Sequence, residues 1–219
     1  MARRRQPGKE RGYRPPSPPR PRWRLPVRQR GFWAGIALGL GVSAAFLALH
    51  FTRGSSSPSR DAPWGADPAH LRARLSALGL PALPVEGRAV HTHEHLDIYL
   101  NGKHVAVPAG VGIGPHSSFF SPLHTHDRTG ILHVESEAKR SYTLGQFFGV
   151  WGVRLDERCI GGYCSGGGRT LEAFVNGARV AGSPAQIALR RHEEIVLAFG
   201  TASELPKRIP TAYSFPAGY

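Results

Sequence analysis

A long uncharged segment sets the first limit on how this chain of 219 residues can fold. Residues 31–51, GFWAGIALGLGVSAAFLALHF, contain no Asp, Glu, Lys or Arg. About 20 predominantly apolar residues are enough for a helix to cross the hydrocarbon core of a bilayer. A cleaved signal peptide has a shorter apolar core of roughly 7–15 residues, and no clear A-x-A cleavage site follows this segment. We therefore interpret residues 31–51 as a single, uncleaved transmembrane helix.

The positive charge of the chain is concentrated before this segment. Residues 1–30 hold eleven Lys or Arg against one Glu, and so account for +10 of the formal net charge of +13. Because the stretch also has seven prolines and little to bury, we predict a disordered basic tail. The positive-inside rule places this tail in the cytoplasm, against anionic lipids, and the rest of the chain outside. The nearly neutral remainder gives no reason to expect a nucleic-acid partner, and no protein partner can be named.

Composition divides the remainder of the chain. The expected parts are a linker over 52–66, a short helix and connection over 67–83, an extracytoplasmic β-rich domain over 84–204 and a C-terminal tail over 205–219. Asp67 followed by Pro68 is typical of a helix start, which predicts a helix over 69–78 that Gly79 ends.

Within the β-rich domain, alternating apolar residues lead into Asn101-Gly102, a strong signal for a type I′ hairpin. This predicts a strand over 96–100 and a return strand over 103–107. Further strands are expected over 130–135, 171–175 and 194–199, and a helix capped by Thr143 over 143–150. The expected fold class is mainly β with one or two short helices, an α+β arrangement preceded by the single transmembrane helix.

The hairpin sequence LDIYLNGKHVAVPA, from Leu96, returns 75 residues later as LEAFVNGARVAGSPA, from Leu171. The two copies are either an internal duplication or two hairpins of a common type that arose independently. Three histidines that precede the first copy correspond to non-histidine residues before the second: His91, His93 and His95 against Gly166, Gly168 and Thr170. The hairpin itself therefore does not require histidine at these positions.

Eight of the eleven histidines lie between His91 and His133, and most fall in the motifs HTHEH and HTHD. Strand residues two apart point to the same side and lie about 6.6 Å from each other, so their two imidazoles can reach one ion. Three such residues span about 13 Å, which is too far for one ion unless the strand bends. We therefore predict that His93 and His95 meet His124 and His126 at one divalent metal ion. His91 would belong to that site or to a second one.

Two acids are expected to accept hydrogen bonds from the ligating imidazoles, namely Asp127 and Glu135. His133, between Leu132 and Val134, is predicted to face the surface or a gap between layers. An all-imidazole set suits Zn²⁺ or Cu²⁺ best, and non-haem iron or nickel less well.

Two other classes of function stay open. One is a metal-dependent extracytoplasmic enzyme with Glu94, Asp127 or Glu135 as base. The other is a structural or partner-binding envelope protein whose histidines bind no metal, including a pH-responsive surface. The chain has no P-loop, G-x-S-x-G or H-E-x-x-H motif, so no catalytic activity is assigned.

The two cysteines of the chain, Cys159 and Cys164, lie in CIGGYC. In an extracytoplasmic domain we expect them to form a disulfide that closes a short loop, and a two-thiolate metal site is the alternative.

Three stretches, HTHEHLDIYLNG, SPLHTHDRTGILHVES and YTLGQFFGVWGV, together resemble a family of uncharacterised prokaryotic membrane-anchored proteins. The resemblance covers roughly residues 85–200 and implies no established activity. Separately, TLGQFF, LEAFVNG and EEIVLAFG resemble the transcobalamin C-terminal type of β-grasp domain. That second resemblance implies hairpins of β-grasp type.

Overall fold

The computed structural model describes residues 64–219. The predicted basic tail, the transmembrane helix and almost all of the linker lie outside these residues. Among residues 64–219, the helices are too short or too polar to cross a bilayer.

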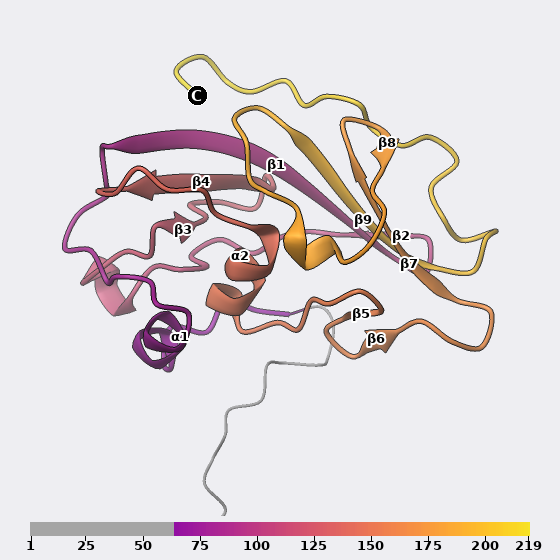
Figure 1. The fold of residues 1–219 in the computed structure, drawn as a ribbon, viewed down its shortest axis with the longest axis horizontal. Helices are drawn as coiled ribbons and strands as arrows, with labels where there is room; N and C mark the ends of the chain where they lie inside the picture. Colours follow the sequence, from indigo (N-terminus) through magenta and orange to yellow (C-terminus); the bar gives the residue numbers. More distant parts are fainter. Residues whose placement is uncertain (1–63) are drawn as a thin grey trace, which may run out of the picture. The chain divides into compact units, whose positions relative to one another are not determined.

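A seven-stranded mixed sheet forms the body of this part of the chain (Figure 1). Its strand order is β3-β4-β1-β9-β7-β8, and β2 pairs with the end of β1. The strands of this sheet are β1 Val90–Leu100, β2 Lys103–Val105, β3 Leu123–His124, β4 Ile131–Ser136, β7 Thr170–Val175, β8 Ala178–Arg179 and β9 Glu194–Gly200. A separate two-stranded sheet joins β5, Cys159–Ile160, to β6, Tyr163–Cys164. The helical elements are α1 Leu71–Ala77, α2 Leu144–Trp151 and the 3₁₀ turns η1 Pro115–Ser117 and η2 Pro184–Gln186. The predicted α+β class, mainly β with two short helices, is confirmed for this region.

Strand β9 lies between the two Asn-Gly hairpins. It runs parallel to β1 and antiparallel to β7. Both residues of each turn have positive φ: 49° and 78° at Asn101-Gly102, and 50° and 80° at Asn176-Gly177. These are the left-handed conformations that a type I′ turn requires, so both hairpins form as their sequences predict.

Helix α2 covers one face of the sheet and is capped as expected. The Thr143 hydroxyl accepts from the Gln146 amide at 3.3 Å, and the Gln146 side chain accepts from the Thr143 amide at 3.0 Å. Its aromatic residues Phe147 and Phe148 are fully buried in the core with the apolar face of β1. Because side chains alternate along β1, this packing directs its histidines to the opposite face.

Helix α1 begins later than its sequence predicts. Its first residue is Leu71, and His70 stands at the N-cap without a side-chain hydrogen bond. Asp67 instead accepts from the Ala69 amide at 2.9 Å, in the turn before the helix. Asp67 therefore shapes the approach to the helix and does not cap it.

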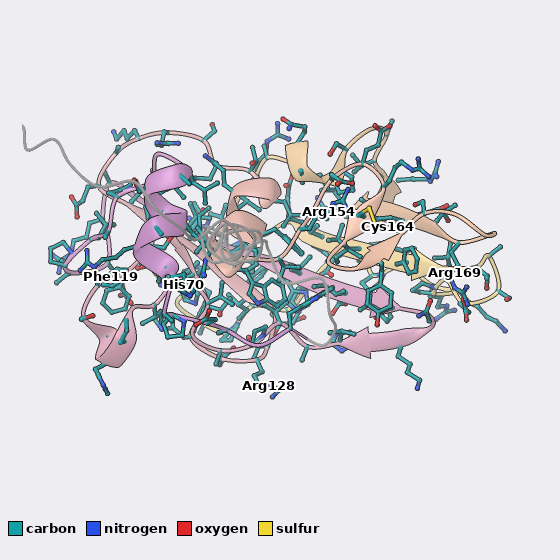
Figure 2. All side chains as sticks on the ribbon, turned by 90° about the horizontal axis from the view of Figure 1, so that it is seen from below. His70, Phe119, Arg128, Arg154, Cys164 and Arg169 are labelled. Carbon is teal, nitrogen blue, oxygen red and sulfur yellow. A yellow bond between two sulfur atoms is a disulfide. The ribbon has the colours of Figure 1, made fainter. Side chains whose placement is uncertain are left out.

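The two cysteines form a disulfide, as expected in preference to a two-thiolate metal site. Cys159 and Cys164 are paired residues of β5 and β6, so the bond closes a short hairpin. The guanidinium of Arg154 lies beside it, 3.8 Å from the Cys164 sulfur (Figure 2).

The final segment, residues 201–219, contains no helix or strand and runs along the side of the sheet away from α1 and α2 (Figure 1). It thus passes over the face toward which the histidines of β1 point.

Candidate metal centre

The centre is built on a row of histidines that crosses three neighbouring strands. His93 of β1 is paired directly with His133 of β4, and His133 is paired in turn with His124 of β3. Two residues further along, on the same face of the sheet, His91 of β1 is paired with Glu135 of β4. Strand pairing therefore brings the HTHEH and HTHD motifs close together, and it does so through a third motif, His133-Val134-Glu135.

Three of these side chains, together with His126, form the largest candidate metal-binding set among residues 64–219. Their ligand atoms all lie within 4.8 Å of one another, and the residues are His124, His126, His133 and Glu135. All but His126 are buried. Three imidazoles and one carboxylate are ligands that several divalent transition metals accept, so this group could chelate a metal ion.

His124 is held in one tautomer. Its side chain is completely buried, and its Nδ1 donates to the Ser121 carbonyl oxygen at 3.0 Å. A carbonyl can only accept, so the proton is on Nδ1 and the lone pair is on Nε2. Burial, more than the neighbouring His133 and His126, lowers the pKa of His124 to about 4, although Glu135 opposes the shift. His124 therefore offers a neutral nitrogen at neutral pH.

His126 presents its Nε2 to the same point. The Nε2 atoms of His124 and His126 are 3.2 Å apart, although the two rings come from either side of Thr125. The Glu86 carboxylate is 3.2 Å from the Nε2 of His126 and 3.8 Å from that of His124. Glu86 is a neighbour of the centre that the sequence did not suggest, because it lies in an irregular segment outside the histidine motifs.

His133 was expected to face the surface or a gap between layers. It lies on the face of the sheet away from the core, as that expectation requires, but it is buried there and not at the surface. The residue is 6% exposed and stands in the middle of the row, with its ring centroid 4.6 Å from that of His93 and 5.2 Å from that of His124. The alternation of Leu132 and Val134 into the core puts His133 and Glu135 together on the other face, but it does not show that neighbouring strands and the C-terminal segment bury them there.

Glu135 accepts a hydrogen bond from His133. Its Oε1 is 3.0 Å from His133 Nδ1 and 3.4 Å from His91 Nε2. Burial raises the pKa of Glu135, but the hydrogen bond with His133 and the nearby imidazoles outweigh this and lower it. The carboxylate is thus charged and central, and it could equally act as a metal ligand.

His93 and His91 form a second set with Glu135, in which the ligand atoms again lie within 4.8 Å. His93 is 5% exposed and, among residues 64–219, its ring makes no hydrogen bond to another side chain or to the main chain. Burial, followed by the charges of His133 and His91, lowers its pKa to about 4. His91 is more open, with 55% of its side chain exposed.

His95 lies in a different group from the other predicted ligands. Its Nδ1 is 2.7 Å from Glu194 Oε2, and its Nε2 is 2.8 Å from the Thr129 carbonyl oxygen. Burial lowers the pKa of His95, but Glu194 and the Thr129 carbonyl together raise it above its usual value. Both nitrogens thus face oxygen acceptors away from the imidazole row. With Asp97, this pair makes a third set of close ligand atoms.

The remaining candidates lie apart from the imidazole row. Asp127 accepts from Thr129, from its amide at 2.9 Å and from its hydroxyl, within a tight exposed turn. These bonds lower the pKa of Asp127, and no histidine ring donates to it in the described region. Glu94 is buried on the opposite face of β1 from His93, so it is not placed to act as a base at this centre.

The C-terminal segment, residues 201–219, covers part of the row of histidines. The Tyr219 ring centroid is 4.5 Å from that of His93 and 5.7 Å from that of His133. Tyr213 stacks on His95 at 3.8 Å with an angle of 7° between the ring planes. The segment predicted as a C-terminal tail thus excludes water from part of the candidate centre.

No protein-family model matches this chain, and comparisons with curated proteins and with solved structures found no match either.

Proposed function

We propose that this chain binds one divalent transition metal ion, Zn²⁺ or Cu²⁺, through His124, His126 and His133 together with Glu135. One observation carries the proposal: four ligand atoms from β3, the following loop and β4 converge to within 4.8 Å of one another. Four protein ligands favour a closed site, which suits storage, sensing or a structural ion better than catalysis.

The spacing of the imidazoles supports a small four-coordinate ion. Two nitrogens bound to one tetrahedral ion at about 2.0–2.1 Å stand about 3.3 Å apart. The Nε2 atoms of His124 and His126 are 3.2 Å apart in the described structure. The Ser121 carbonyl orients the His124 ring, and such partners of the non-ligating nitrogen are a regular feature of metal-binding histidines.

Imidazole and carboxylate donors favour Zn²⁺ and Cu²⁺ over Mg²⁺ and Ca²⁺, which prefer oxygen ligands alone. For a given set of nitrogen ligands, Cu²⁺ generally binds more tightly than Zn²⁺. Which metal the protein retains therefore depends on the availability of each metal as well as on affinity. Only direct metal analysis distinguishes Zn²⁺ from Cu²⁺.

The first experiment is metal analysis by mass spectrometry on the full chain, purified without a polyhistidine tag. We expect near-stoichiometric Zn or Cu in the wild type and loss of that metal in a His124→Ala/His126→Ala variant. His70→Ala is the matched control, because His70 is exposed and makes no side-chain hydrogen bond at the start of α1. Wild-type protein that takes up neither metal after reconstitution would contradict the proposal.

We further propose that the centre is held outside the cytoplasm by residues 31–51, with lipids as the partner of the basic tail. The length of the uncharged segment and the charge before it support this placement. The arrangement of two hairpins, a helix and a central parallel pair, β1 with β9, supports a β-grasp type of sheet. Membrane fractionation and protease protection in intact cells test the placement, and a soluble, protected chain would contradict it.

A further inference from the structure

A second pair of histidines lies beside the proposed centre and shares one of its ligands. The set formed by His91, His93 and Glu135 has all its ligand atoms within 4.8 Å of one another. Neither His91 nor His93 belongs to the set that contains His124 and His126, whereas Glu135 belongs to both. The carboxylate is therefore the common point of two adjoining sets.

The position of Glu135 between the sets follows from the strand register. Glu135 is paired with His91 across β1 and β4, and it stands two residues from His133 on the same face of β4. Its Oε1 is 3.0 Å from a nitrogen of His133 and 3.4 Å from a nitrogen of His91. An ionised carboxylate has two oxygens and about four lone-pair directions, so it can serve two ions at once.

We propose that the centre is dinuclear: a second divalent transition metal ion is held by His91 and His93, and Glu135 bridges the two ions. This inference rests on the proposed function, since it adds an ion to the same centre. Two-metal sites in proteins have ions about 3.5–4 Å apart, a separation that a shared carboxylate supports.

The second position differs from the first in its openness. It has three protein ligands in place of four, and one of them, His91, is largely exposed. His93 is covered by the ring of Tyr219, so the free coordination positions lie toward the His91 side. Three protein ligands with water in the remaining position are the arrangement that lets a metal accept a small ligand or activate a water molecule.

The test is a titration of the metal-free full chain, without a tag, with Zn²⁺ and in parallel with Cu²⁺, read as ions bound per chain. We expect two ions in the wild type, and one in His93→Ala and in His91→Ala. His91→Ala guards against a folding defect, because His91 is exposed whereas His93 is buried. His70→Ala, remote from the centre, should retain two.

Electron paramagnetic resonance of the Cu²⁺ form gives a second readout. Two Cu²⁺ ions joined by a carboxylate couple magnetically, so the integrated signal should fall well below the total copper in the wild type. It should equal the bound copper in His91→Ala, which keeps one isolated ion.

The outcomes separate this inference from the proposed function. No bound ion in the wild type overturns both. One ion in the wild type, lost in His124→Ala/His126→Ala, leaves the proposed function standing and overturns the dinuclear centre. Two uncoupled ions, or two ions retained in both His91→Ala and His93→Ala, also overturn it. Loss of both ions from His91→Ala also overturns the dinuclear centre.

Discussion

At the scale of single residues, Glu94 is a buried acid without a compensating charge. Its Oε1 accepts from the Thr92 hydroxyl at 2.9 Å, and its buried Oε2 has no hydrogen-bond partner in the described region. Burial raises the pKa of Glu94 to about 7, against the lowering effect of Thr92. The folded chain therefore keeps Glu94 protonated at pH values where the unfolded chain, with a pKa of 4.5, releases the proton.

This difference predicts that Glu94 lowers stability as the pH rises. Between pH 4.5 and 7 the folded state binds more protons, so the free energy of unfolding falls, by about 3 kcal/mol in total. We expect Glu94→Gln to stabilise the metal-free chain by roughly 2–3 kcal/mol at pH 8 and to have little effect at pH 4.5. Urea unfolding at both pH values measures this, and Glu137→Gln, at an exposed site, should change neither. Equal stabilisation at the two pH values would rule out ionisation as the cause.

His124 changes the stability with pH in the opposite direction to Glu94, because burial lowers the pKa of His124 to about 4 from a usual 6.5. Below pH 6.5 the unfolded chain gains a proton that the folded chain does not bind, so His124 costs stability as the pH falls. The cost reaches about 2 kcal/mol at pH 5.

Because Glu94 and His124 have opposite slopes over this range, the informative quantity is the difference between the wild type and His124→Gln. We expect the wild type to lose about 2 kcal/mol relative to His124→Gln when the metal-free chains are moved from pH 7.5 to pH 5. Urea unfolding in the presence of a chelator measures it. A difference that stays constant with pH would show that His124 is not a buried neutral imidazole.

At the scale of elements, the capping box of α2 offers a direct test of the fold. The Thr143 side chain accepts from the Gln146 amide, and Thr143→Ala removes that acceptor. We expect a loss of about 1 kcal/mol in the free energy of unfolding. Thr143→Ser keeps the hydroxyl and should remain within a few tenths of the wild type. If the serine variant is as unstable as the alanine variant, the loss comes from the methyl group and not from the cap.

Local sequence was sufficient to predict most individual elements. Alternation in LDIYL and the Asn-Gly turns predicted the two hairpins, and Thr143 predicted the start of α2. These features depend on residues close together in the chain, where period and turn chemistry act directly. Helix α1 was less well predicted, because Asp67 bonds within the preceding turn and does not bond to the helix.

The composition of the centre could be predicted only in part, because it depends on which strands are neighbours. A period of two assigns a side chain to a face but does not say which strand lies beside it. The pairing of β4 with both β1 and β3 makes His133 central, and the pairing of β1 with β9 commits His95 to Glu194. Glu86 comes from a segment without periodicity, so no pattern pointed to it.

At the scale of the whole molecule, the candidate centre is partly covered by a segment far from it in sequence. Tyr219 packs against His93 and His133, and its main-chain oxygen is 3.1 Å from His192 Nε2. The ring therefore covers the His93 and His133 side of the candidate centre, whereas the side chains of His126 and His91 are 40% and 55% exposed. If the centre binds a metal ion as proposed, we expect the C-terminal segment to affect the rate of metal exchange, while the strands determine which ligands are present.

This division of roles predicts a kinetic effect of Tyr219→Ala. Ring contacts of this type contribute about 0.5–1.5 kcal/mol, so their loss should speed removal of the metal by a chelator roughly two- to twelvefold. The amount of metal bound at saturation should not change, because the ligands remain. Tyr219→Phe retains the ring and should exchange at the wild-type rate, as measured by stopped-flow absorbance of a coloured chelator. If the alanine variant binds less metal and does not exchange it faster, the ring supports the ligands themselves, and the segment is part of the centre and not only its cover.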